Sequence, residues 1–196
     1  MTVVESHRRW SVEEYLAFEA ESPIRHEYVA GEIYAMSGVA DAHNRAAINL
    51  LILLQQQLRA GPCEFFISDV KLRVEAADAY FYPDVFVTCD PRDALDPLVK
   101  RHAKLVVEVL SDSTEAYDRG QKFLSYQRLD SLQEYVLVDS HERQVEVFRR
   151  AEDGAWTYRA YGPEDTLRLE SVGLEARLGD VYEGVRLEPR PPPSAG

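Results

Sequence analysis

The segment LVVEVLSDST, residues 105–114, constrains the fold more than any other part of the sequence. Its apolar residues are interrupted only by Glu108, and the run is closed by serine and aspartate. A run of this kind is typical of a β-strand that is covered on both faces. An ionised glutamate inside such a strand costs several kcal/mol unless a partner compensates its charge. The sequence therefore predicts an internal strand and a compensating group beside Glu108.

Other segments carry clear helix and strand signals. Ser11-Val12-Glu13-Glu14 has the form of a capping box and should open a short helix through about residue 20. Alternating residues on either side of Ala30-Gly31 predict a hairpin, and the apolar body of residues 41–60, closed by Gly61-Pro62, predicts a long helix. The remaining expected elements are strands at 64–74, 82–90, 104–110, 134–139, 144–150 and 155–161, a turn at 76–80 and a helix at 115–129.

This order of elements indicates the fold class. Neighbouring strands mixed with helices favour an α/β (α+β) architecture, with a mixed central sheet flanked by helices and additional antiparallel strands at both ends. The sequence contains neither GxGxxG nor a Walker loop, so we expect no nucleotide cofactor. A length of 196 residues suits one domain, expected at residues 1–188, followed by a Pro-rich disordered tail at 189–196.

Composition indicates a soluble cytoplasmic protein. Hydrophobic residues make up 45% of the chain and charged residues 29%, as in ordinary globular domains. The longest apolar stretch, residues 48–54, is too short to span a bilayer, and the N-terminal residues lack the apolar segment of a secretory signal. Cys63 and Cys89 have no metal-ligand spacing, and we expect both to be unpaired thiols in a reducing cytoplasm.

The formal net charge of −12 limits the partners that the chain can bind. A field of this sign repels phosphate backbones, so a nucleic-acid ligand would require a local basic patch or bridging cations. Carboxylates that bind a metal would account for part of the charge, because the bound cation neutralises them.

Two carboxylates are candidate metal ligands. Asp84, in Tyr82-Pro83-Asp84-Val85, lies at the mouth of one expected strand, and Glu108 lies inside the next strong one. Acidic side chains from adjacent strands can converge on one divalent cation, and such oxygen ligands suit Mg²⁺. Asp84 could instead be an ordinary turn aspartate after proline, and Glu108 could have an unrelated buried partner.

Lys122 is the candidate cation of this region. Asp118, Lys122 and Tyr126 are spaced i, i+4, i+8 and share one face of the expected helix. The alternative is a surface ion pair, worth about 0.3 kcal/mol. Gly120 in mid-helix costs about 0.5–1 kcal/mol relative to alanine, which suggests close approach of another group to the backbone.

Two further residues are weaker candidates when taken singly. His43 stands at the start of the long helix, where the positive helix end favours a neutral imidazole that can accept a proton or a ligand. Glu27 lies in the expected hairpin. The alternatives are an exposed first-turn histidine and a glutamate on the solvent face.

Four segments of the sequence carry a family resemblance: Pro83-Asp84, Glu108 in LVVEVLSDST, Asp118 and Lys122 in YDRGQKFLSYQ, and EYVLVD. Together they resemble the Uma family of putative restriction endonucleases, in the PD-(D/E)XK nuclease superfamily. The similarity covers roughly residues 10–185. It implies a restriction-endonuclease-like fold with Asp84 and Glu108 as ligands of Mg²⁺, or of Mn²⁺ in its place. The superfamily lysine usually follows the acid by two residues, where this chain has Leu110, and the resemblance implies that Lys122 replaces it.

The resemblance also implies the remaining roles. Glu27 and His43 match family positions that complete a catalytic site with Asp84, Glu108 and Lys122, in which a metal-bound water attacks a DNA phosphodiester. A homodimer is expected by analogy, because cutting both strands commonly pairs two active sites. Two alternatives stay open: a catalytically inactive dimeric nucleic-acid-binding or interaction module, and a metal-dependent hydrolase of another phosphate ester. A basic face could hold the phosphate backbone, or could simply be solvated surface: Lys100, Arg101, Lys104, Arg119 and Arg128.

Overall fold

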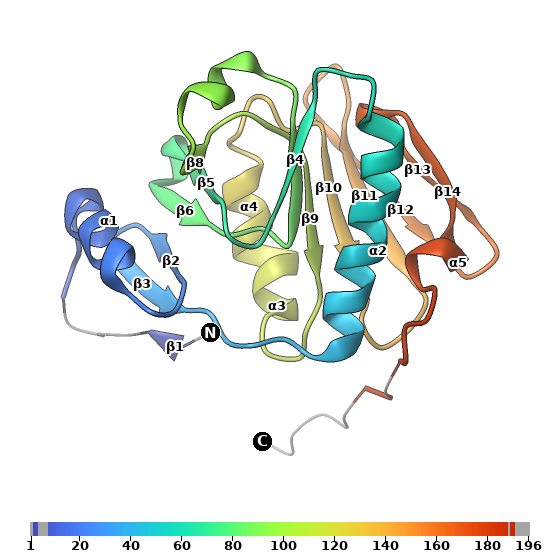
Figure 1. The fold of residues 1–196 in the computed structure, drawn as a ribbon, viewed down its shortest axis with the longest axis horizontal. Helices are drawn as coiled ribbons and strands as arrows, with labels where there is room; N and C mark the ends of the chain where they lie inside the picture. The colour runs from blue at the N-terminus through green and yellow to red at the C-terminus, as the bar shows by residue number, and fades with distance from the viewer. Residues whose placement is uncertain (1, 4–7, 188, 191–196) are drawn as a thin grey trace.

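The described residues form two six-stranded sheets and one two-stranded sheet. Helices pack against the sheets (Figure 1). A computed structural model of the chain describes residues 2–3, 8–187 and 189–190. The larger helical elements are α1 (Val12–Glu21), α2 (Asp41–Leu58), and a continuous helical segment made of α3 (Glu115–Tyr117), a π-helical turn (Asp118–Lys122) and α4 (Phe123–Tyr126).

One six-stranded sheet contains the strand that the sequence placed at the centre of the fold. Its order is β12-β11-β10-β9-β7-β4, in which β9 and β10 are parallel and the other pairs antiparallel. The bounds are β4 Glu64–Ile67, β7 Val85–Thr88, β9 Ala103–Val109, β10 Glu134–Val138, β11 Val145–Arg150 and β12 Trp156–Tyr161. We refer to it below as the central sheet.

Strand β9 is covered on both faces, as its apolar run predicted. Leu105, Val107 and Val109 join a core cluster with α2, whereas Val106 and Leu110 join a second cluster with α4. Because side chains alternate along a strand, Glu108 shares the α4 face with Val106. The predicted internal strand is confirmed, and its glutamate points toward the helical segment.

The other six-stranded sheet, the N-terminal sheet, has the order β1-β3-β2-β6-β5-β8. Its strands are β1 Thr2–Val3, β2 His26–Val29, β3 Glu32–Ala35, β5 Lys71–Val74, β6 Ala79–Phe81 and β8 Val99–Lys100. Helix α1 covers one face through Tyr15, which clusters with Tyr28. The other face joins the core of α4 through Leu72 and Phe81, so the helical segment lies between the two sheets.

Local signals in the N-terminal part were confirmed. The Ser11 hydroxyl accepts from the Glu14 amide at 3.2 Å and the Glu14 carboxylate accepts from the Ser11 amide at 2.9 Å, which is the expected capping box. The β2–β3 hairpin turns at Ala30 and Gly31, with φ of 47° and 92°. Two positive φ values are the signature of a type I′ turn, which explains the glycine.

The predicted strand over 64–74 is wrong, because the chain changes sheets in the middle of it. β4 belongs to the central sheet and β5 to the N-terminal sheet. Ser68 lies between them with a φ of 37°, in the left-handed region, and its amide donates to the carbonyl of Pro83. The predicted turn at 76–80 is a 3-10 turn, Glu75–Ala77, which Asp78 separates from β6, so residues 79 and 80 belong to the strand.

The C-terminal part contains elements that the sequence patterns did not indicate. β13 (Thr166–Leu169) and β14 (Leu174–Arg177) form a hairpin, and α5 (Leu178–Val181) follows. The apolar residues of this hairpin and of α5 complete the core on the α2 face of the central sheet. Most of the predicted tail, 189–196, lies outside the described residues, but Arg190 forms ion pairs with Glu115 and with Asp139.

The prediction of unpaired cysteines is wrong. Cys63 and Cys89 form a disulfide, with their Cα atoms 4.0 Å apart. The pairing Glu64↔Thr88 between β4 and β7 places the two cysteines directly opposite each other at the end of this strand pair. The bond therefore fastens edge strand β4 to its neighbour.

The helix predicted at 115–129 is present but ends near Tyr126 and contains the π-helical turn. A Cβ at Gly120 would meet no atom within 4 Å, so the close approach inferred from this glycine is not found. In the described part of the chain, no helix combines the length and apolarity needed to cross a membrane.

Candidate functional site

A cavity of about 120 Å³ opens where β9 ends and the helical segment begins. It lies between elements of both sheets, because β2 belongs to the N-terminal sheet and β7 and β9 to the central sheet. All five residues predicted as catalytic line it, together with Asp118: Glu27, His43, Asp84, Glu108 and Lys122. The fold thus gathers in one place residues that lie far apart in the sequence.

The Lys122 side chain is the centre of this cluster. Its buried ammonium lies 2.9 Å from Glu108 Oε1, 3.0 Å from Glu27 Oε1 and 3.6 Å from Asp118 Oδ1. Asp118 precedes Lys122 by four residues, so the two share a face of the helical segment as expected. Lys122 therefore reaches back to the acidic residue of β9, although Leu110 occupies the position after it where the superfamily lysine would stand.

Glu108 has two partners for the charge that the sequence left unexplained. Its Oε1 atom accepts from the Tyr126 hydroxyl at 2.8 Å and contacts the Lys122 ammonium. Burial raises the pKa of Glu108 well above its ordinary value, while the charge of Lys122 opposes that rise. One ammonium shared with other carboxylates compensates only part of the cost of burying this charge.

Glu27 and Asp118 are also incompletely compensated. Glu27 Oε1 accepts from the Tyr82 amide at 3.2 Å, but its Oε2 atom has no hydrogen-bond partner among the described residues. Asp118 Oδ1 likewise has no hydrogen-bond partner in the described part of the chain. Burial raises the pKa of both carboxyl groups, and Lys122 partly offsets each rise. Buried acceptors of this kind cost about 1–3 kcal/mol each when they stay unsatisfied.

Asp84 is the more accessible carboxylate, with 16% of its side chain exposed. Its Oδ2 atom accepts from the Val109 amide at 2.7 Å and lies 3.2 Å from His43 Nε2. His43 comes from the first turn of α2 and is buried, so the alternative of an exposed first-turn histidine does not hold. These contacts fix Asp84 at the end of β9, beside Glu108.

The charge balance of the cavity fits a divalent cation. Four carboxylates (Glu27, Asp84, Glu108 and Asp118) and one ammonium line the cavity, which leaves three negative charges when all are ionised. Oxygen ligands are those that Mg²⁺ prefers, and Mg²⁺ commonly uses one or two carboxylates and keeps several waters. Within the described residues, no three His, Cys, Asp or Glu side chains are spaced to hold one ion. Asp84 and Glu108 as a two-carboxylate site stay a prediction.

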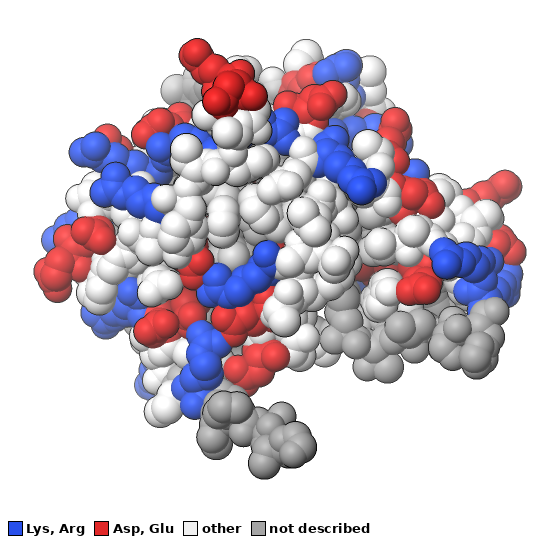
Figure 2. Space-filling view, turned by 180° about the vertical axis from the view of Figure 1, so that it is seen from behind, with Lys and Arg blue, Asp and Glu red and all other residues white. Residues whose placement is uncertain are grey.

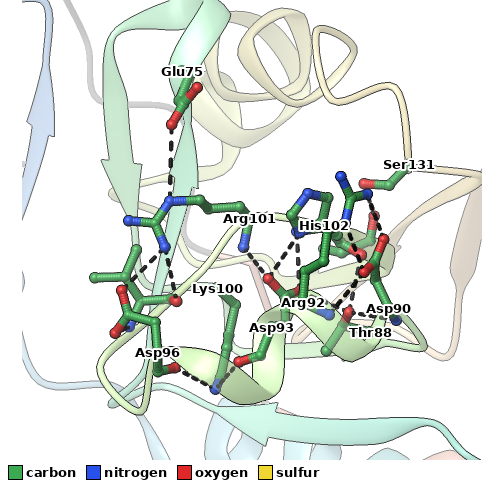
Figure 3. Close-up of polar contacts among 12 residues, drawn as sticks. Glu75, Thr88, Asp90, Arg92, Asp93, Asp96, Lys100, Arg101, His102 and Ser131 are labelled. Atoms are coloured by element: carbon green, nitrogen blue, oxygen red, sulfur yellow. Dashed lines mark hydrogen bonds and ion pairs between the residues drawn. The ribbon is translucent and has the colours of Figure 1, made fainter.

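Several of the residues predicted to contact a phosphate backbone have their charged groups engaged by other groups of the protein. The Lys100 side chain is only 4% exposed, and its ammonium donates to the carbonyls of Asp93 and Asp96, both at 2.7 Å. Arg101 forms ion pairs with Asp96 at 3.0 Å and with Glu75 at 3.8 Å. Figure 3 shows both side chains inside this network of polar contacts around Asp93. Lys100 therefore presents no ammonium to the surface.

The other three basic candidates differ in their contacts. Arg119 makes a bidentate pair with Glu146 at 2.8 Å and contacts Glu115 at 2.9 Å, so carboxylates neutralise it. Arg128 donates to the Ala76 carbonyl at 2.8 Å, and Lys104 lies partly buried near the start of β9. On the face shown in Figure 2, Lys and Arg stand beside Asp and Glu and form no continuous basic patch.

Sequence reasoning missed three contributors to the site. Asp118 and Tyr126 were placed on the face of Lys122 but received no role, although their spacing was the available signal. Tyr82 stands next to Pro83-Asp84, and its amide holds Glu27. No pattern in the sequence indicates that contact, because it joins strands that are far apart along the chain.

The fold resembles that of a solved structure, described as "Crystal structure of a putative nuclease belonging to DUF820 from Anabaena variabilis ATCC 29413". The TM-score is 0.76, with 16% sequence identity, over 90% of this chain and 99% of that one. The predicted fold class is confirmed, and the chain has a nuclease-like fold.

The family follows from the sequence comparison. Residues 12–179 match the model of the Uma2 family, described as "Putative restriction endonuclease", and the chain belongs to this family. Two uncharacterised proteins of Synechocystis sp. (strain ATCC 27184 / PCC 6803 / Kazusa) are related to it. The protein slr1290 is 41% identical over 89% of this chain and 92% of its own length, and sll1609 is 34% identical over 80% and 89%.

Proposed function

We propose that this chain is a Mg²⁺-dependent DNA endonuclease. The observation that carries the proposal is a cavity lined by four carboxylates and one ammonium, which three of the carboxylates contact, because this surplus of negative charge provides a place for a divalent cation. The description of the Uma2 family as restriction endonucleases supports DNA as the substrate.

In this proposal Asp84 and Glu108 hold Mg²⁺, with Mn²⁺ as a substitute. A bound Mg²⁺ supplies a water of lowered pKa and stabilises negative charge on the scissile phosphate. The other residues orient these groups. His43 and the Val109 amide fix Asp84, and the Tyr126 hydroxyl fixes Glu108.

Lys122 is the group that we assign to the reacting phosphate. Its ammonium already lies beside Glu108, and a positive charge there offsets the charge that develops on the phosphate oxygens. Glu27 also contacts the ammonium, at 3.0 Å, and in this proposal it holds Lys122 in place. A homodimer would place two such sites on the two strands of a duplex.

One observation favours a second candidate, a catalytically inactive nucleic-acid-binding or interaction module that retains the fold. Three of the five basic residues expected to face DNA have their charges satisfied inside the protein: Lys100, Arg101 and Arg119. With a net charge of −12, DNA binding then depends on bridging cations.

A cleavage assay separates these functions. Supercoiled plasmid and single-stranded DNA are incubated with the protein in Mg²⁺, in Mn²⁺ and in EDTA. We expect nicking that requires the metal and falls at least 100-fold in Glu108→Gln and in Lys122→Met. Glu134→Gln is a matched control, since Glu134 is a buried glutamate of neighbouring strand β10 that pairs with Arg149 instead.

The outcomes differ for each candidate. Equal cleavage by wild type and both site variants would refute the mechanism. Metal-dependent DNA binding without cleavage would favour the inactive module. Hydrolysis of bis(p-nitrophenyl) phosphate with no cleavage of either DNA would indicate another phosphate ester as the substrate.

A further inference from the structure

Helix α1 supplies no residue to the lining of the cavity, yet it carries a buried carboxylate. Glu19 is only 2% exposed, although it lies on a helix whose charged residues are otherwise at the surface. A buried glutamate costs several kcal/mol unless it is hydrogen-bonded and paired. The contacts of the Glu19 carboxylate therefore indicate its structural role.

The Glu19 carboxylate joins two segments of the chain. Oε1 accepts from the His26 amide at 3.1 Å and from the Tyr82 hydroxyl at 2.8 Å. Oε2 lies 3.0 Å from His26 Nδ1. The Tyr15 hydroxyl, one turn earlier on α1, donates to the His26 carbonyl at 2.8 Å. Both polar groups of the His26 backbone are thus held from α1.

Each of these anchor points adjoins a residue of the candidate site. His26 is followed directly by Glu27, and Tyr82 is separated from Asp84 only by Pro83. The Tyr82 amide also donates to Glu27 Oε1. Tyr82 is thus bound at its hydroxyl by Glu19 and at its amide by Glu27, so it connects Glu19 to both the β2 segment and the segment that leads into β7.

We propose that Glu19 is a positioning residue that fixes Glu27 of β2 relative to Asp84, which lies in the segment leading from β6 into β7. Glu19 acts through His26 and Tyr82 and makes no direct contact with Glu27 or Asp84. The inference deepens the proposed function, on which its metal-binding part rests. Partners that orient metal ligands typically change metal affinity or activity by about 10–100-fold when removed.

The test compares Glu19→Ala with Glu19→Gln and with Glu21→Ala as a matched control. Glu21 lies on the same helix but is exposed. The amide of glutamine keeps an acceptor for the Tyr82 hydroxyl, so Glu19→Gln should restore most of what Glu19→Ala loses. Far-UV circular dichroism checks that each variant folds. If Glu19→Ala does not fold, Tyr82→Phe removes one of the same hydrogen bonds and replaces it in the test.

The first measurement needs neither metal nor activity. In metal-free protein, hydrogen exchange of the Tyr82 amide should become at least tenfold faster in Glu19→Ala and stay at the wild-type rate in Glu21→Ala. The second measurement is Mn²⁺ binding by titration, for which we expect at least tenfold weaker affinity in Glu19→Ala and near-wild-type affinity in Glu19→Gln.

The two measurements separate the inference from the proposed function. Wild-type protein that binds no Mn²⁺ refutes the metal site, and Tyr82 exchange alone then decides the positioning role. Unchanged Tyr82 exchange in Glu19→Ala overturns the positioning role, whatever the wild type binds. Faster exchange with unchanged Mn²⁺ affinity overturns its connection to the metal ligands.

Discussion

Breaking the disulfide between Cys63 and Cys89 should destabilise the chain by an amount that the structure allows us to calculate. The two residues are separated by 26 positions. For a loop of this length the chain-entropy relation gives about 2.9 kcal/mol from the length-dependent part and about 0.6 kcal/mol from the constant, hence about 3.5 kcal/mol. In a domain of this size the melting temperature should fall by about 7–14 °C.

The assay uses oxidised protein in which thiol titration finds no free cysteine. Urea unfolding is compared for wild type, for wild type with a reductant, and for Cys63→Ser/Cys89→Ser. Reduced wild type and the double variant should lose similar stability, because both lack the same constraint on the unfolded chain. The reductant should leave the double variant unchanged, which controls for effects on the rest of the protein.

Two results would refute this reasoning. A loss below 1 kcal/mol would mean that the bond constrains little of the unfolded chain, so that the calculated loop entropy does not apply. A large loss in the double variant but none in reduced wild type would trace the effect to the serines and not to the bond.

Further predictions concern the cavity and one turn. Burial raises the pKa of Glu108, so ionisation of this carboxyl group lowers the stability of the fold as the pH rises from 4.5 through the raised pKa. In EDTA, Glu108→Gln should therefore have a higher melting temperature than wild type, and the difference should be larger at pH 8 than at pH 5. An equal difference at the two pH values would contradict this prediction. Mg²⁺ at 100 times its Kd should stabilise wild type by about 2.7 kcal/mol but should not stabilise Asp84→Asn. Thermal melts of both proteins measure this effect, with Ca²⁺ as the comparison ion. Lys122→Met should lose about 3–5 kcal/mol in urea, because its carboxylates would stay buried and unpaired. Gly31→Ala should lose about 1 kcal/mol, since φ at this position is 92°, and no change would argue against the type I′ turn.

Sequence patterns predicted the central elements because their signals are local. The run around Glu108 could only be a covered strand, and the i, i+4 spacing of Asp118 and Lys122 was enough to place them on one face of a helix. The capping box at Ser11 and the glycine after Ala30 depend on neighbouring residues alone, so they too could be predicted.

The remaining features depend on which distant segments lie side by side. The cysteines pair because β4 and β7 are neighbours, and composition suggested free thiols instead. Lys100 belonged to an apparent basic cluster, yet the turn around Asp93 folds its ammonium inward onto two carbonyls. The change of sheet at Ser68 has no periodic signal, since strand-forming residues flank it on both sides.

The position of Lys122 between the two sheets has a mechanical consequence. Its ammonium contacts Glu27 of the N-terminal sheet and Glu108 of the central sheet, so one side chain forms ion pairs with both sheets. A ligand that draws the ammonium away from either carboxylate removes this polar link, and the two sheets are then joined here by the apolar core that contains Leu72, Phe81 and Val106.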